Sequence, residues 1–314
     1  MAEDYALRTT ERPSTRGLAR LVAGLRGQRA RVAWCPETPR LDGAVALVSG
    51  GSRGIGWATS LGLAARGAEV VSASRGREAG HRLTEAIAAR SWAPAHAVEL
   101  DLSAPDSIAA ALDALEKILA GRRLDVLVAN AGLWPSRYGT SAEGFEIAFA
   151  TNVLGHHRLL AGARARGLLA DGARVVIVTG DIYILSGECT PDYRYRGALG
   201  GQLAYCRSKL GNLWYARELA RRDATLRVHA VHPGVIASEL AGPNVGWIGR
   251  IKRAVLLSIE EGAQTSLFCA TQPGLASGTY YHNVLGRMEL APSDPAADDA
   301  RAGALWEWLE AVDA

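Results

Sequence analysis

The sequence predicts an α/β fold: a single Rossmann-type, doubly wound parallel sheet of about seven strands with helices on both faces. From Asp42 onward, short β-branched segments alternate with Ala/Leu-rich stretches of helical length. The strand segments are apolar on both faces, which is typical of parallel strands that are covered by helices on both sides. Because parallel crossovers are right-handed, this alternation indicates a doubly wound sheet.

The boundaries of these elements follow from the apolar periodicity and the Gly/Pro positions. Strands are expected at 44–49, 69–73, 95–100, 125–129, 174–179, 227–231 and 278–281. Helices are expected at 55–66, 78–89, 105–120, 141–166, 202–222, 260–271 and 298–312. The stretches 186–201 and 241–258 are long for connections, which favours functional loops.

The chain of 314 residues is long enough to bury one large core. Residues 1–40 form an N-terminal extension, in which Leu and Val alternate with arginines at helical spacing over 17–31. This basic helix either packs on the main body as a solvated amphipathic helix or docks on a membrane surface or partner. Residues 41–314 form the main domain.

Composition narrows the classes of partner. Hydrophobic residues make up 48%, charged residues 21%, and the net charge is +3, so nucleic acid is not expected as a partner. Four widely spaced cysteines and the adjacent His156 and His157 form no metal-binding or disulfide pattern, which favours free thiols in the cytoplasm. No apolar run reaches the ~20 residues of a transmembrane segment, and no secretory signal is recognised.

A glycine-rich turn joins the first strand to the first helix of the main domain. Its sequence, SGGSRGIG over 49–56, has the spacing G-x-x-x-G-x-G. Gly50 permits the tight turn, Gly54 allows close approach of a pyrophosphate, and Gly56 allows close packing of helix and strand. The free N–H groups and the positive dipole end of the helix attract phosphate. The turn therefore predicts a dinucleotide site.

Three more motifs follow in order: Asn130-Ala131-Gly132 after the fourth strand, the Y-x-x-x-K pair Tyr205 and Lys209, and Pro233-Gly234 after the sixth strand. Together with the turn, they resemble the short-chain dehydrogenase/reductase family over residues 42–290. The stretches AYCRSKLGNLWYARELARR, HPGVIASEL and EEGAQTSLFCA look especially like the retinol-dehydrogenase branch. The resemblance implies that 41–314 is a catalytic domain that binds NADP and usually forms a homo-oligomer.

The cofactor residues that the resemblance implies lie in the turn, at strand ends and around the Y-x-x-x-K pair. They are Gly50, Ser52, Arg53, Gly54, Ile55, Gly56, Arg75, Asp101, Leu102, Asn130, Ala131, Gly132, Tyr205, Lys209, Pro233, Ile236 and Ser238. Among them, the resemblance places Asp101 beside the adenine and Pro233, Ile236 and Ser238 beside the nicotinamide. NADP is favoured over NAD because the second strand ends without an acid and is followed by Arg75, whose guanidinium suits a 2′-phosphate. Both Arg53 and Arg75 are otherwise ordinary exposed arginines.

Tyr205 and Lys209 are the expected proton-transfer residues. They stand at i and i+4, so they share one helix face. A free tyrosine has a pKa of ~10, and a neighbouring cation favours the phenolate. The resemblance assigns Tyr205 as proton donor or acceptor, Lys209 as a partner of the nicotinamide ribose, and Asn152 as the residue that shapes the active-site helix and holds a relay water.

The family's catalytic serine is missing. Counting back 13 residues from Tyr205 gives Asp192 in a loop, whereas aligning the fifth strand places Gly180 at the serine position. Thr179 and Asp181 are the candidates for the missing polar group. A charged Asp181 would repel a developing oxyanion.

The function expected is NADP-dependent interconversion of a ketone or aldehyde and an alcohol, as in a ketoreductase. Apolar residues such as Trp134 and Trp247 in the loops favour a medium-sized hydrophobic substrate, although they can instead pack in a core or dimer contact. Two alternatives remain open: a non-catalytic NADPH-binding protein, which the loss of the serine suggests, and a family member that catalyses dehydration or epimerisation.

Overall fold

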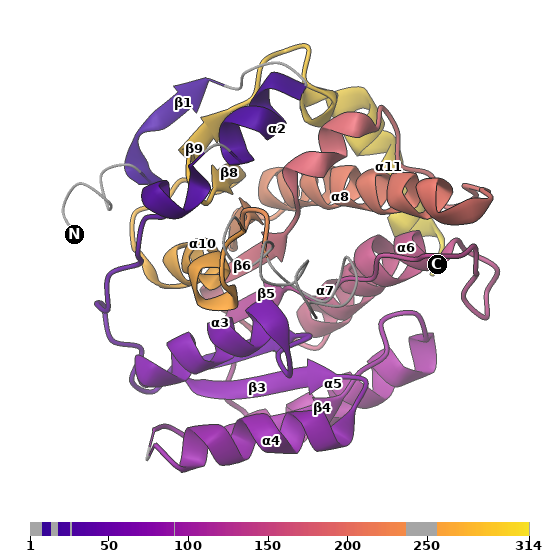
Figure 1. Ribbon diagram of the computed structural model, residues 1–314. Helices are drawn as coiled ribbons and strands as arrows, with labels where there is room; N and C mark the ends of the chain where they lie inside the picture. Colours follow the sequence, from indigo (N-terminus) through magenta and orange to yellow (C-terminus); the bar gives the residue numbers. More distant parts are fainter. Residues whose placement is uncertain (1–7, 14–17, 26, 91, 237–255, 314) are drawn as a thin grey trace, which may run out of the picture.

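The computed structural model describes residues 8–13, 18–25, 27–90, 92–236 and 256–313 (Figure 1). These residues form one nine-stranded sheet with the order β1-β9-β8-β7-β6-β5-β2-β3-β4. All neighbouring strands are parallel except β8 and β9. The chain moves outward from β2 in both directions, so the predicted doubly wound α/β fold is confirmed.

The strands are β1 (Glu11–Pro13), β2 (Val45–Ser49), β3 (Glu69–Ser74), β4 (Ala95–Glu99), β5 (Leu124–Ala129), β6 (Leu169–Val178), β7 (Arg227–His232), β8 (Thr279–His282) and β9 (Gly286–Glu289). The α-helices are α2 (Leu18–Leu25), α3 (Gly54–Ala65), α4 (Arg77–Ala88), α5 (Pro105–Leu119), α6 (Ile147–Phe149), α7 (Gly155–Ala165), α8 (Gly197–Arg222), α10 (Ile259–Thr271) and α11 (Asp299–Ala311). Shorter turns are η1 (Gln28–Arg31), η2 (Ala150–Leu154), η3 (Asp181–Leu185) and η5 (Pro295–Ala297).

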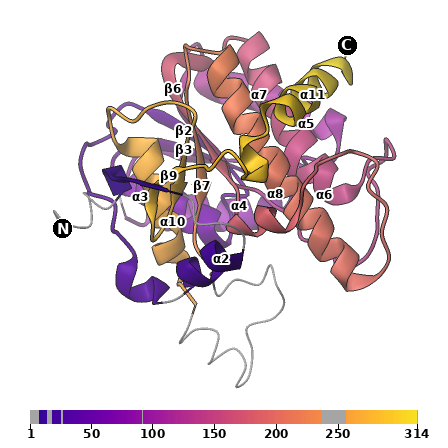
Figure 2. The same cartoon turned by 90° about the horizontal axis from the view of Figure 1, so that it is seen from above.

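Two apolar layers cover the sheet. In β2, Val45 and Leu47 join the core beneath α5, α7, α8 and α11, whereas Ala46 and Val48 join the core beneath α3, α4 and α10. This alternation follows from the pleat, which sends successive side chains to opposite faces. Figure 2 shows α3 and α10 on one side of the sheet and α7, α8 and α11 on the other.

The helix predicted over 141–166 is wrong in its first part. Thr140 and Glu146 form a β-bridge, the first helical residues are Ile147–Phe149, and η2 is a π-helical turn before α7 begins. The Glu146 side chain accepts a hydrogen bond from the Phe149 N–H, so it caps the new start. Turns of π-helix are rare in proteins, and those that occur are often found at functional sites.

The N-terminal segment packs on the main domain. β1, which the sequence did not predict, pairs in parallel with β9 at one edge of the sheet. The basic helix covers only Leu18–Leu25 of the expected 17–31, and its Arg20 is completely buried. Among the described residues, no helix has the length and apolar character to cross a membrane.

Candidate functional site

The glycine turn lies between the end of β2 and the start of α3. Gly50 and Gly54 have φ angles of 65° and 54°, a region that favours glycine. A Cβ atom at Gly56 would lie 2.2 Å from the carbonyl oxygen of Gly50, so only glycine fits there. The N-cap residue Arg53 makes no side-chain capping hydrogen bond at the N-terminus of α3, and a Cβ at Gly54 would face open space. The turn thus presents uncapped N–H groups to an open space, as a phosphate requires.

Ser49, the last residue of β2, ties the turn to the neighbouring strand. Its Oγ accepts hydrogen bonds from the backbone N–H groups of Asn130 and Ala131, both at 3.0 Å. The Asn130 side chain in turn donates to the Ser49 carbonyl oxygen at 2.9 Å. The N-A-G motif therefore fixes the floor of the site at the ends of β2 and β5.

His156, for which the sequence predicts no part in a metal site, is a buried member of this floor. Its Nδ1 lies 3.0 Å from the carbonyl oxygen of Asn152, and its Nε2 lies 2.8 Å from Ser49 Oγ. The carbonyl can only accept, so Nδ1 carries the proton and Nε2 accepts from the serine hydroxyl. Burial lowers the pKa of His156 to about 4, which keeps the ring neutral.

Asn152 lies in the π-turn η2 and is completely buried. Its Oδ1 accepts from the Leu133 N–H at 2.7 Å, and its Nδ2 donates to Leu133 O at 3.0 Å and to Ser208 Oγ at 2.9 Å. Asn152 therefore holds both the loop after Gly132 and the helix α8 that carries Tyr205.

Tyr205 and Lys209 lie on α8, with the Lys209 Nζ 5.4 Å from the centroid of the Tyr205 ring. Lys209 is buried, and its Nζ donates to the Val178 carbonyl oxygen at 2.9 Å. Burial lowers the pKa of the ammonium to about 8 and raises that of the half-buried Tyr205 phenol. Without a bound molecule, the phenol is therefore protonated near neutral pH and suits a proton donor.

Trp134 lies directly on the phenol. The indole and the Tyr205 ring are stacked, with centroids 4.7 Å apart and planes 9° apart. The loop that carries Trp134 approaches α8 closely, because a Cβ at Gly201 would lie 2.0 Å from the carbonyl oxygen of Pro135. Trp134 thus forms an apolar wall beside the group that would transfer the proton.

Gly180 follows β6, at the position where the family has serine. A Cβ there would have His232 Nδ1 and Ile182 Cγ2 as its nearest neighbours, both at 3.8 Å. The backbone is extended, with φ −172°. Neither space nor backbone conformation therefore requires glycine at this position.

The two candidates for the missing polar group are already engaged inside the protein. The Thr179 hydroxyl donates to the carbonyl oxygen of Lys209 at 2.7 Å. The Asp181 carboxylate accepts from the Tyr280 hydroxyl at 2.5 Å and lies 3.4 Å from Arg20 Nε. Either group would have to break these bonds before it could reach a substrate.

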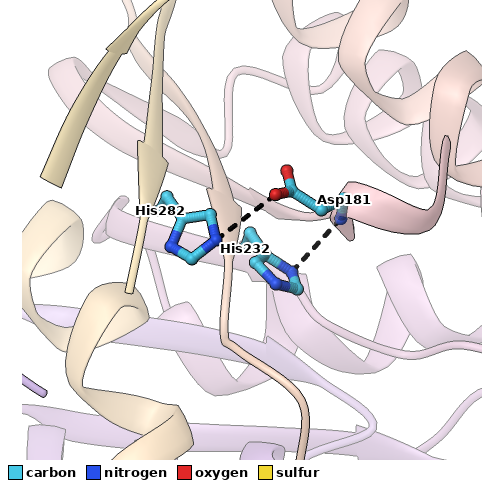
Figure 3. Close-up of side chains that lie close together, drawn as sticks. All are labelled: Asp181, His232 and His282. Carbon is cyan, nitrogen blue, oxygen red and sulfur yellow. Dashed lines mark hydrogen bonds and ion pairs between the residues drawn. The ribbon is translucent and has the colours of Figure 1, made fainter. Parts of the chain in front are cut away.

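Asp181, His232 and His282 form a buried cluster that the sequence analysis missed because its members are about 50 residues apart (Figure 3). Their ligand atoms lie within 4.8 Å of one another, a spacing that suits a metal ion. Despite burial, which acts in the opposite direction, hydrogen bonding to His282 and the positive charge of Arg20 lower the pKa of the Asp181 carboxyl. The Asp181 side chain is therefore ionised in this cluster.

The proton positions in this cluster favour hydrogen bonding over metal binding. His282 Nδ1 accepts from the backbone N–H groups of Val284 and Leu285, at 3.1 and 3.3 Å. Its proton then lies on Nε2, which faces Asp181 Oδ2 at 3.3 Å. A metal would need the Nε2 lone pair instead, and the guanidinium of Arg20 already provides a cation beside the carboxylate.

The expected residues of the adenosine half lie along the ends of β2, β3 and β4. Arg53 and Arg75 are exposed. They follow the ends of β2 and β3, which are neighbours in the sheet because Ser49 pairs with Ala73. Asp101 Oδ1 accepts from the N–H and hydroxyl of Ser103, at 2.9 and 2.7 Å. Ser52 and Ile55 are half-buried in the turn, and Leu102 is part of the core.

The expected residues of the nicotinamide half follow β7. Pro233 is buried, Ile236 is half-buried, and Ser238 lies outside the described residues, as do the apolar residues at 240, 247 and 248. The turn, the N-A-G segment, Tyr205 with Lys209, and the start of this loop all lie at the carboxyl ends of β2, β5, β6 and β7, where ligands of doubly wound sheets bind.

Comparisons with known proteins agree with this geometry. Residues 50–255 match a family model described as enoyl-(acyl carrier protein) reductase. Human retinol dehydrogenase 12 is 34% identical over 254 residues, which cover 79% of this chain and 80% of that protein. Human retinol dehydrogenase 14 is 31% identical over 321 residues, which cover 94% of this chain and 93% of that protein.

Solved structures give the same result. A short chain dehydrogenase from Burkholderia cenocepacia in complex with NADP is 25% identical, with a TM-score of 0.62 over 79% of this chain and 99% of that one. A blue fluorescent protein from a metagenomic library in complex with NADPH is also 25% identical, with a TM-score of 0.63 over the same shares. The chain therefore belongs to the short-chain dehydrogenase/reductase family of oxidoreductases.

Proposed function

We propose that the protein is an NADP-dependent oxidoreductase that interconverts a ketone or aldehyde and an alcohol. The observation that carries this proposal is the pair of Tyr205 and Lys209, held on α8 beside the uncapped glycine turn. Among the described residues, Lys209 Nζ makes one hydrogen bond, to Val178 O, so two of its three N–H groups are left for a ligand. A buried ammonium with spare donors fits the hydroxyls of a nicotinamide ribose.

In this proposal Tyr205 donates a proton to the carbonyl oxygen of the substrate, while a reduced nicotinamide, when bound, supplies the hydride to the carbonyl carbon. Lys209 stabilises the phenolate that remains, because its ammonium lies on the same helix face. Asn152 holds the loop and helix around this pair. In the direction of alcohol oxidation the same phenolate accepts the proton.

The proposed substrate is a medium-sized hydrophobic ketone, aldehyde or alcohol, such as a retinoid, steroid, terpenoid or polyketide. Trp134 offers an apolar, flat surface beside Tyr205. Tyr138, in the loop after Gly132, and Tyr195, in the predicted functional loop 186–201, form an edge-to-face pair. Two relatives carry the name retinol dehydrogenase, which agrees with a substrate of this class.

The alternatives predict different behaviour. A non-catalytic NADPH-binding protein would bind the cofactor and reduce nothing; Gly180 and the engaged groups of Thr179 and Asp181 favour it. A dehydratase or epimerase would turn over without net consumption of NADPH. Because a binding protein has no need for a buried ammonium beside a phenol, catalysis by Tyr205 and Lys209 is the better proposal.

Three further expectations remain predictions. They are a cytoplasmic location, which agrees with four free, buried cysteines, assembly into a homo-oligomer, and the division into residues 1–40 and 41–314.

Replacing Arg75 with Ala is expected to weaken NADPH binding by about 10- to 100-fold and to leave NADH binding unchanged, because one charge-assisted contact to the 2′-phosphate is lost. Calorimetric titration of both cofactors measures this. Arg77→Ala is the matched control, since Arg77 is exposed nearby but forms an ion pair with Glu99. Equal losses in both variants would contradict the role of Arg75.

Replacing Tyr205 with Phe is expected to lower turnover by at least about 100-fold, because the proton donor is removed, while NADPH binding stays nearly intact. Turnover is followed by NADPH absorbance with a panel of retinoid, steroid and polyketide ketones. A variant that reduces these ketones at the rate of the wild type would reject the assignment.

The reduction rate is expected to fall as the pH rises through about 8, because burial lowers the pKa of Lys209 to about 8 and the cation is present only below that pKa. Lys209→Arg keeps a cation at every accessible pH and should move this fall upward. The measurement is log(kcat/KM) against pH for both proteins. Superimposable profiles would show that another group sets the limit.

Replacing Gly180 with Ser is expected to raise kcat/KM for ketones by about tenfold or more, since one donor to an oxyanion contributes on this scale. The neighbouring atoms at 3.8 Å leave room for the added Cβ atom, so the free energy of unfolding should hold or rise slightly. Gly180→Ala, which adds the same Cβ without the hydroxyl, is the control. If both variants gain equally, position 180 does not face the substrate oxygen.

A further inference from the structure

The N-terminal segment inserts polar side chains between the elements that carry the site. Arg8, Arg20 and Gln28 are buried, with 1%, 0% and 1% of their surface exposed. Burial of such side chains is costly unless their hydrogen bonds are satisfied inside the protein. Each therefore marks a specific contact with the main domain.

Gln28 holds one residue of the loop after β7 by both of its backbone groups. Its Nε2 donates to the Val235 carbonyl oxygen at 3.0 Å, and its Oε1 accepts from the Val235 N–H at 3.2 Å. The same carbonyl also accepts from the Leu257 N–H at 3.0 Å. Gln28 therefore supplies the acceptor for the Val235 N–H and a second donor to the Val235 carbonyl oxygen.

Arg8 holds the start of the same loop through Asn283. Its guanidinium donates to Asn283 Oδ1 at 2.9 Å and to Thr265 Oγ1 at 3.1 Å. The Asn283 Nδ2 then donates to the Pro233 carbonyl oxygen at 2.7 Å. Since Arg8 can only donate, it fixes which end of the amide faces Pro233.

We propose that Gln28 is a positioning residue for the nicotinamide half of the cofactor, because it fixes the backbone of Val235 between Gly234 and Ile236. This inference rests on the proposed NADP site, in which Pro233 and Ile236 border the nicotinamide. Gly234 has a φ angle of 88°, and the described part of the segment belongs to no strand or helix. Its order comes from the bridge between Ile236 and Leu257 and from side-chain contacts. Arg8 supports the same loop from the side of Pro233.

The physical basis is preorganisation. A loop that is ordered before the ligand arrives does not have to lose conformational freedom on binding. Gln28 holds Val235 by two neutral hydrogen bonds. Their loss should therefore appear as weaker binding of the nicotinamide half, while the adenosine half, which lies at the ends of β2, β3 and β4, is unaffected.

The experiment compares two ligands with two variants. Gln28→Leu removes both hydrogen bonds at similar volume, and Gln28→Glu keeps the acceptor but turns a carboxylate oxygen toward the Val235 carbonyl. Calorimetric titration with NADPH and with 2′,5′-ADP, which lacks the nicotinamide, gives the affinities. We expect both variants to bind NADPH about 5- to 30-fold more weakly, as loss of these bonds implies, and 2′,5′-ADP as the wild type does.

Gln272→Leu is the matched control. Gln272 is also buried, and its Nε2 donates to the Thr38 carbonyl oxygen at 2.8 Å, away from the loop after β7. It should lose stability without changing either affinity. Thermal unfolding of all variants separates lost stability from lost positioning, and the KM for NADPH should rise more than kcat falls.

The outcomes separate this inference from the function on which it rests. If Gln28→Leu and Gln28→Glu bind NADPH as tightly as the wild type, or lose both ligands equally, the inference is wrong and the NADP site stands. If the wild type binds neither NADPH nor 2′,5′-ADP, the proposed function itself fails. Should Gln28→Leu not fold, Gln28→Glu alone decides.

Discussion

The hydrogen bond from Lys209 Nζ to the Val178 carbonyl oxygen joins the two elements on which the site depends. It ties α8, which presents Tyr205, to the last residue of β6, which leads into Gly180. Lys209 and Val178 are both buried, and the same carbonyl oxygen also accepts a hydrogen bond from Asn212 Nδ2 at 3.3 Å. Desolvation makes such a bond strong and makes the ammonium easier to neutralise. The Lys209 Nζ atom therefore both anchors α8 to β6 and supplies the charge that stabilises the phenolate in the proposed reaction.

Around this bond, buried polar side chains replace the packing that apolar residues provide elsewhere. The buried Ser49, Asn152 and His156 and the half-buried Asn130 connect β2, β5 and η2 in one network with defined proton positions. A partly satisfied network would cost more than an apolar core, so its members must keep their partners. The network therefore holds the floor of the site in one arrangement. The loops form the side of the site that faces the ligand.

The sequence predicted the parts of the protein that follow simple periodicities. The seven strands β2 to β8, the glycine turn and the helical position of Tyr205 and Lys209 could be predicted, because apolar runs, Gly spacing and i, i+4 geometry are local signals. The strands at 11–13 and 286–289 were missed, since ERP and GRME have no apolar alternation. The cluster of Asp181, His232 and His282 depends on contacts between distant segments. Buried Arg8 and Arg20 were missed because arginine normally indicates surface.

β1 also determines how the sheet ends. Without it, β9 would present a row of free backbone groups at the margin of the sheet, and such a row can recruit a strand from another molecule. The strand that covers it is only three residues long, and it ends in Pro13, which has no N–H to donate. The outermost position is thus occupied by a segment that offers little for a further strand to pair with. The segment that stabilises the fold at this margin therefore also protects the protein from uncontrolled self-association.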